Sequence, residues 1–229
     1  MRAVAVIPAR AGSKGVLRKN ARLLAGRPLV AYTIAAAIGS CVFDTIAVST
    51  EDAEIAAIAR AAGAKVVERP ASLASDAALT EPVMSHALEA LESEGEPAFE
   101  SVWLLQPTSP LRTAEDIASA SSLLKSEDVD AVVSVVPDHC FYWRSETEDC
   151  GLIVPEYDLS ARPRRQDLPP RWRENGAIYG VSRAVWDMAG VRAAGRIAGY
   201  VMDADRSLEI DTEADWSIAE AMLGCGQLP

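Results

Sequence analysis

The sequence contains few of the residues on which several protein classes depend. Only 6% of its 229 residues are aromatic, and it has two histidines and four cysteines. The cysteines form no CxxC pair and no spacing typical of metal ligands, which argues against a zinc domain or a thioredoxin-like site. We expect reduced thiols, because a bridge between Cys140 and Cys150 would need an oxidising compartment.

Long hydrophobic runs are also missing. The apolar stretch 29–38 contains Tyr32 and Thr33 and is too short to span a bilayer. No signal peptide precedes the first apolar run, so we expect a cytoplasmic protein without a membrane partner. The net charge of −11 argues against nucleic acid as the main partner.

Acidic residues are missing from one place in particular, since none occurs before Asp44. The apolar run Ala3–Ile7 predicts a buried strand, and a loop with Gly12 and Gly15 follows it. Glycines let backbone amides approach an anion closely, and basic side chains neutralise it. The segment therefore predicts a phosphate site rather than an ordinary solvated loop; its basic residues are Arg2, Arg10, Lys14, Arg18, Lys19, Arg22 and Arg27.

Two common phosphate-binding motifs are absent from this loop. No GxGxxG follows the first strand, and no glycine precedes Gly12 at the spacing of a GxxxxGK[ST] motif. The sequence thus excludes a dinucleotide fingerprint and a Walker loop. A second basic cluster lies at 162–173, and two such clusters on an acidic protein favour a small polyanionic substrate.

Strand-like and helix-like segments alternate along most of the chain, which predicts a mostly parallel sheet with helices on both faces, an α/β Rossmann-like fold. We expect Thr80 and Thr113 to be helix N-caps and Gly63 to end a helix. The predicted strands are 3–7, 45–49, 65–67, 101–105, 131–136, 176–181 and 200–203, and the predicted helices are 29–38, 52–62, 81–94, 114–124 and 213–223.

The stretch 138–174 breaks this alternation. It is long, rich in Arg and Pro, and has no clear helix, and such segments are usually functional lids or arms. We interpret it as an arm inserted within one domain that covers residues 1–229. Its consecutive Arg164 and Arg165 suit recognition of a carboxylate or phosphate, or equally an oligomer contact.

Two further clusters carry polar chemistry. Residues 104–112, Leu-Leu-Gln-Pro-Thr-Ser-Pro-Leu-Arg, place an amide, hydroxyls and a guanidinium after a predicted strand, although a proline-stiffened turn is the alternative. Glu209 and Asp211 would share one face of a strand and, because two adjacent carboxylates repel, we propose a Mg²⁺ between them. The alternative is that Asp211 and Thr212 cap the last helix.

These motifs together resemble the acylneuraminate (sialic acid) cytidylyltransferases. The resemblance runs from the first strand to the last helix and rests on residues 7–15, 19–20, 49–50, 69–76, 105–112, 175–179 and 210–212. It implies a sheet of the nucleotide-diphospho-sugar transferase type and a reaction in which CTP and a nine-carbon 2-keto sugar acid give the CMP-sugar and pyrophosphate. It also implies Mg²⁺ as cofactor and a homodimer in which the arm reaches the neighbouring subunit.

The resemblance assigns roles to individual residues. Arg10, Ser13, Lys14 and Lys19 would hold the triphosphate, and Asn20, Arg69, Ala78 and Thr80 would contact the cytidine. Gln106, Arg165 and Tyr179 would line the sugar pocket, and Asp211 with Glu209 would bind Mg²⁺. Arg10, Lys14, Lys19 and Asp211 would carry catalysis.

Three departures from the family pattern are visible. The metal pair is Glu-x-Asp instead of Asp-x-Asp, Glu51 stands where aspartate is usual, and no phosphatase-like domain follows the last predicted helix. The alternatives are a transferase of the same fold that acts on another base or sugar (legionaminate, pseudaminate or 3-deoxy-octulosonate) and a nucleotide-binding regulator without catalysis.

Overall fold

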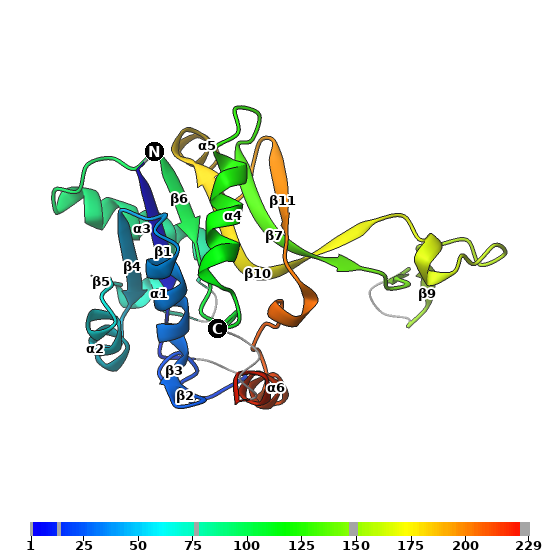
Figure 1. The fold of residues 1–229 in the computed structure, drawn as a ribbon, viewed down its shortest axis with the longest axis horizontal. Coiled ribbons are helices and arrows are strands. Elements are labelled where there is room, and N and C mark those ends of the chain that lie inside the picture. Colours follow the sequence, from blue (N-terminus) through cyan, green and yellow to red (C-terminus); the bar gives the residue numbers. More distant parts are fainter. Residues whose placement is uncertain (1, 13–14, 76–77, 147–150, 225–229) are drawn as a thin grey trace.

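The computed structural model of the chain describes residues 2–12, 15–75, 78–146 and 151–224 (Figure 1). Within these residues the main sheet has seven strands, which lie in the order β11-β7-β10-β6-β1-β4-β5. In chain order they are β1 (Ala3–Pro8), β4 (Thr45–Thr50), β5 (Lys65–Glu68), β6 (Ser101–Leu104), β7 (Ala131–Asp138), β10 (Arg171–Ser182) and β11 (Ile197–Val201). The short strands β2 (Leu23–Leu24) and β3 (Arg27–Pro28) form a separate ribbon.

The predicted mostly parallel α/β sheet is confirmed. β1 pairs in parallel with β4 and β6, β4 with β5, and β7 with β11. β10 alone among these strands runs antiparallel, between β6 and β7. Because the other strands are parallel, the loops that follow β1, β4 and β6 meet at one edge of the sheet, which is where ligands bind in open α/β sheets.

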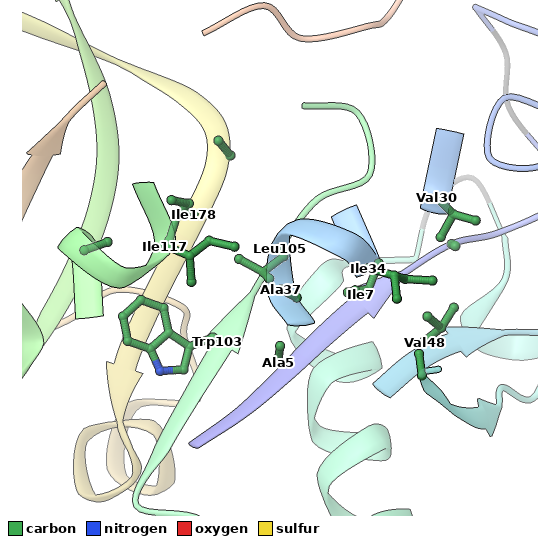
Figure 2. Packing of buried hydrophobic residues seen from close by; sticks show 14 of the residues in the cluster. Ala5, Ile7, Val30, Ile34, Ala37, Val48, Trp103, Leu105, Ile117 and Ile178 are labelled. Carbon is green, nitrogen blue, oxygen red and sulfur yellow. The ribbon is translucent and has the colours of Figure 1, made fainter. Parts of the chain in front are cut away.

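Helices cover both faces of this sheet (Figure 1). They are α1 (Leu29–Gly39), α2 (Ala53–Ala61), α3 (Thr80–Ser93), α4 (Ala114–Leu124), α5 (Arg183–Ala189) and α6 (Glu213–Gly224). Side chains of a strand alternate between its faces, so β1 is buried on both. Ala5 and Ile7 pack with α1, α2 and α4, as Figure 2 shows in part, whereas Val4 and Val6 pack with α3 and α5.

Two of the three helix ends predicted from cap residues are confirmed, and one is wrong. Thr113 caps α4 through a capping box with Asp116, and Gly63 follows α2 with a φ of +90°, as predicted. Thr80 is not an N-cap: it is the first residue of α3, after Leu79, and no side chain caps that end. Among the described helices, none is both long and apolar enough to cross a membrane.

The arm is more regular than its sequence suggests. It contains the ribbon of β8 (Trp143–Ser145) and β9 (Ile153–Pro155) and a 3-10 turn, η2 (Arg165–Asp167). Its last four residues, 171–174, begin β10, so the late strand predicted at 176–181 starts five residues earlier. Paired ends of β7 and β10 carry the arm well away from the sheet (Figure 1).

Other predicted boundaries were also wrong. β11 lies at 197–201 instead of 200–203, and the short helix α5 was not predicted. Glu209 and Asp211 are not in a strand, because the segment 207–212 pairs with none of the described strands. Ile210 is nevertheless fully buried, whereas Glu209 is partly buried and Asp211 is exposed.

Candidate active site

A cavity of about 380 Å³ opens at the carboxyl edge of the parallel strands. Its wall comes from the loops after β1, β5 and β6, the start of α3 and the segment before α6. Eight residues that the resemblance assigned to the site line it together: Arg10, Lys19, Asn20, Arg69, Ala78, Thr80, Gln106 and Asp211. Residues far apart in the sequence are therefore brought together as the parallel topology predicts.

Backbone contacts shape the part of the cavity next to β1. Asn20 is almost fully buried and its Nδ2 donates to the carbonyl of Arg10 at 2.9 Å. The Nη1 of Arg10 donates to the carbonyl of Ser75 at 3.1 Å, which links the first loop to the segment before α3. Asn20 thus stabilises the first loop through this hydrogen bond, independently of any contact with a ligand.

Lys19 lies between the first loop and the acidic segment. Its Nζ donates to the carbonyl of Ile210 at 2.6 Å and lies 3.4 Å from Oδ1 of Asp211. The Lys19 side chain is 12% exposed and that of Asp211 is 68% exposed. The Lys19 ammonium is therefore held in place in the cavity wall, next to the solvent-exposed carboxylate of Asp211.

The two carboxylates differ in their surroundings. Glu209 is partly buried and accepts a hydrogen bond from Thr108 Oγ1 at 3.3 Å. Burial and the neighbouring charge of Asp211 raise the pKa of the Glu209 carboxyl. Asp211 does not cap α6 with its side chain, since Thr212 and Asp215 form that cap. Asp211 is thus available for another role.

Glycines allow two close approaches at this end of the cavity. A Cβ on Gly15 would lie 1.7 Å from the carbonyl oxygen of Asp211, so only glycine fits there. Gly176 has a φ of +68°, and a Cβ there would lie 2.6 Å from Glu209 Oε1 and 2.8 Å from Gln106 Oε1. Gln106 and Glu209 therefore converge over the bare backbone of Gly176.

A bulge in β10 brings Gly176 to this position. Glu174 lies opposite Val135 and Tyr179 opposite Val133, so four residues of β10 face one residue of β7. Bulges bend a strand and turn its backbone out of the ladder. The fully buried Asn175 fixes this bend: its Oδ1 accepts from Ser134 Oγ at 2.6 Å, and its Nδ2 donates to Ser207 Oγ at 2.9 Å.

Arg112 holds the loop after β6 against the bulge. Its guanidinium is buried and donates to the carbonyls of Ala177 at 2.6 Å and Gln106 at 3.3 Å and to Thr33 Oγ1 at 2.7 Å. Burial among these neutral acceptors lowers the pKa of Arg112. Its contact with the Gln106 backbone makes it a support for the amide that lines the cavity.

Five predicted site residues are not among those that line the cavity, and one of them is Glu209, which lies beside the bare backbone of Gly176. Ser13 and Lys14 lie outside the described residues. Arg165 is on η2 of the arm, and Tyr179 packs on the α3 face of the sheet, where its hydroxyl donates to Glu174 Oε2 at 2.8 Å. Burial and this carboxylate raise the pKa of Tyr179. Their assigned roles stay predictions.

Sequence reasoning missed three contributors. Ser75 and Thr108 line the cavity, and Gly176 shapes the place where Gln106 and Glu209 meet. All three stand inside the quoted motif segments, so the signal that could have found them was the motif as a whole. Their residue types alone, common in turns, do not distinguish them from loop residues.

The sequence pattern of the cytidylyltransferases matches residues 4–196 of the chain. The chain belongs to the cytidylyltransferase family. This confirms the family resemblance that the motifs suggested.

Several relatives are similar over most of this chain. N-acylneuraminate cytidylyltransferase A of Danio rerio is 34% identical over 94% of the chain, which spans 49% of that protein. The N-acylneuraminate cytidylyltransferase of Escherichia coli is 34% identical over 94% of the chain, which spans 51% of it. CMP-N,N'-diacetyllegionaminic acid synthase of Legionella pneumophila is 35% identical over 99% of the chain and 98% of its own length. The chain thus spans about half the length of the first two and nearly all of the third.

Solved structures of cytidylyltransferases share the fold. A CMP:2-keto-3-deoxy-manno-octonic acid synthetase complexed with CTP superposes with a TM-score of 0.71 at 15% identity, over 99% of this chain and all of that one. The 4-diphosphocytidyl-2C-methyl-D-erythritol synthase of Anaerococcus prevotii gives a TM-score of 0.69 at 13% identity, over 97% of this chain and 98% of its own. At such identities the likeness establishes the fold alone.

Proposed function

We propose that the chain transfers CMP from CTP to the anomeric hydroxyl of a nine-carbon 2-keto sugar acid and releases pyrophosphate. The observation that carries the proposal is that the partly buried Arg10 and Lys19, the exposed Asp211 and Gln106 line one cavity. Relatives whose names specify acylneuraminate and diacetyllegionaminate support an acid of this type.

The cavity suits the charge changes of this reaction. The sugar hydroxyl oxygen would form a bond to the α-phosphorus of CTP, and the bond from this phosphorus to the oxygen that bridges the α- and β-phosphates would break. The hydroxyl proton would pass to solvent. Negative charge then grows on the leaving pyrophosphate, and positioned cations stabilise it. Arg10 and Lys19 would supply these charges, together with Lys14. Asn20, Arg69, Ala78 and Thr80 would contact the cytidine.

The acidic segment fits a Mg²⁺ ion that binds together with the nucleotide. Mg²⁺ in phosphoryl-transfer sites takes one or two carboxylates, with phosphate oxygens and water completing its shell. The described residues contain no group of three or more His, Cys, Asp or Glu that could hold a metal, so phosphate oxygens and water would have to complete the shell. Asp211 would hold the ion with Glu209, and the ion would neutralise phosphate charge.

The arm supports a homodimer. Large apolar side chains are exposed on it, among them Trp143, Ile153 and Trp172. None of the described residues 138–174 belongs to a cluster of buried hydrophobic residues. A second copy that covers these side chains would stabilise the arm by removing apolar area from water. Arg165 would then lie at the sugar end of the second copy's cavity.

The first experiment measures pyrophosphate release with CTP and Mg²⁺ against N-acetylneuraminate, N,N'-diacetyllegionaminate, pseudaminate and 3-deoxy-octulosonate. We expect strong release with one of the first two acids. Release with none of the four, while CTP still binds, would contradict the proposed substrate class and favour a regulator or an untested sugar.

A second experiment tests the arm. Arg165→Ala and Asp211→Asn are each expected to lower activity, and mixed subunits are measured after dissociation and reassociation. If each arm serves the neighbouring cavity, a mixed dimer has one doubly altered site and one intact site, so activity returns. Mixing that restores nothing, although mixed dimers form, would show that Arg165 does not act in the second copy.

A further inference from the structure

Glu51 connects two walls of the cavity. It stands directly after β4, and its carboxylate oxygens make different contacts: Oε1 accepts from the backbone N–H of Ala11 at 2.8 Å, and Oε2 accepts from Nη2 of Arg69 at 3.0 Å. Ala11 belongs to the first loop and Arg69 follows β5. One side chain thus bridges the ends of three parallel strands.

Arg69 depends on this carboxylate. Its side chain is 4% exposed, and burial lowers its pKa while the charge of Glu51 opposes that change. Its other contact is a long one, from Nη1 to the carbonyl of Leu73 at 3.5 Å. A buried guanidinium with a single carboxylate partner loses both its charge balance and its orientation when that partner is removed.

Arg69 also has a donor that the fold does not use. Its Nε is buried and has no hydrogen-bond partner among the described residues. A buried donor without a partner costs free energy, so native structures rarely keep one without a reason. Arg69 lines the cavity, so its guanidinium has a donor left over for a ligand bound there.

We propose that Glu51 is a positioning residue that orients Arg69 toward the nucleotide and fixes the first loop beside it. The proposal rests on the proposed function, since it needs CTP to be the ligand of this cavity.

The test measures CTP affinity by calorimetry, without any sugar acid. Glu51→Gln keeps an amide oxygen for Ala11 and loses the charge that Arg69 needs. We expect CTP to bind about tenfold more weakly, as for one lost charge-assisted contact. Glu54→Gln is the control: Glu54, in the first turn of α2, pairs with Arg18 at 2.5 Å, and Arg18 does not line the cavity as Arg69 does, so the CTP affinity of this variant stays within about twofold.

A double-mutant cycle separates positioning from a general effect on the fold. If Glu51 acts through Arg69, the Glu51→Gln change weakens CTP binding little further in an Arg69→Met background. Glu51→Asp keeps the charge and is expected to recover part of the affinity. Wild-type affinity in Glu51→Gln, full additivity with Arg69→Met, or no recovery in Glu51→Asp would each overturn the proposal. If the wild-type protein binds CTP but releases no pyrophosphate with any of the sugar acids, that result would count against the proposed reaction and not against the role of Glu51.

Discussion

Replacing Gly176 by alanine tests whether the convergence of Gln106 and Glu209 matters for the reaction. The new Cβ would lie 2.6 Å from one oxygen of Glu209 and 2.8 Å from the amide oxygen of Gln106. Both oxygens would have to withdraw by several tenths of an ångström to reach ordinary van der Waals separation. The perturbation therefore acts on two predicted site residues without changing either of them.

The conformational cost of the substitution has a matched control in the same chain. Gly190, at the end of α5, has a φ of +64°, close to the +68° of Gly176, and a Cβ there meets nothing within 4 Å. Alanine in the left-handed region costs about 1–2 kcal/mol. In a chain of this size each kcal/mol lowers Tm by about 2–4 °C. Both variants should lose stability to this extent.

Only the Gly176 variant should lose activity beyond that. Displacing a substrate-positioning group by a fraction of an ångström to 1 Å costs up to about 100-fold in rate. We expect kcat/KM for the sugar acid to fall about 10- to 100-fold in Gly176→Ala and to stay within about twofold in Gly190→Ala. CTP affinity measured without Mg²⁺ should change little in either, because Glu209 is also a proposed metal ligand.

The assay is pyrophosphate release at varied sugar acid and saturating CTP, with Tm measured on the same preparations. Equal kcat/KM in the two variants would refute the reasoning, because it would mean that Gln106 and Glu209 are not used where the structure brings them together. A large loss of CTP affinity in Gly176→Ala would refute the placement of this effect at the sugar end.

Three further predictions follow from single contacts. Asp211→Asn should abolish pyrophosphate release and leave Tm nearly unchanged, because Asp211 is exposed and, among the described residues, only the Lys19 side chain contacts its carboxylate. Burial would raise the pKa of Asp116, but Arg206 and Thr113 hold it below its usual range, so its stabilisation is complete above about pH 4 and lost as pH falls. Chemical denaturation should therefore find that Asp116→Asn is less stable than wild type at pH 7, and that this difference in stability is smaller at pH 3. Arg112→Met should raise the KM for the sugar acid more than the CTP dissociation constant, since Arg112 holds the Gln106 carbonyl.

The central sheet could be predicted because burial on both faces leaves a strong signal in the sequence. The strand predicted at 3–7 is β1 at 3–8, and α4 has its predicted bounds of 114–124. Continuous apolar runs give the strands, and Thr113 gives the helix start. The parallel order that collects Arg10, Asn20 and Gln106 at one edge followed from the alternation of strands and helices.

The arm and the edge strand could not be predicted in the same way. β8 and β11 expose alternate or all residues, so no apolar run distinguishes them from loops. Thr80 was misread for a different reason: a hydroxyl residue before an apolar helix is typical of an N-cap, yet here it lines the cavity. Residue types that suit both capping and ligand contact cannot be assigned to one role without the geometry.

The residues of the segment Asn175–Tyr179 have different structural roles, although they belong to one sequence motif. In a regular strand Gly176 and Tyr179 would lie on opposite faces of the sheet, and the sequence alone does not show which face meets the cavity. The bulge turns Gly176 toward Gln106 and Glu209, and the ladder resumes at Tyr179, whose ring packs on the α3 face beneath Arg192. Asn175 makes this division possible, because its buried amide satisfies the partners that the interrupted ladder leaves. The polar residue of the motif therefore supports the bend, and the glycine provides the room in which Gln106 and Glu209 meet.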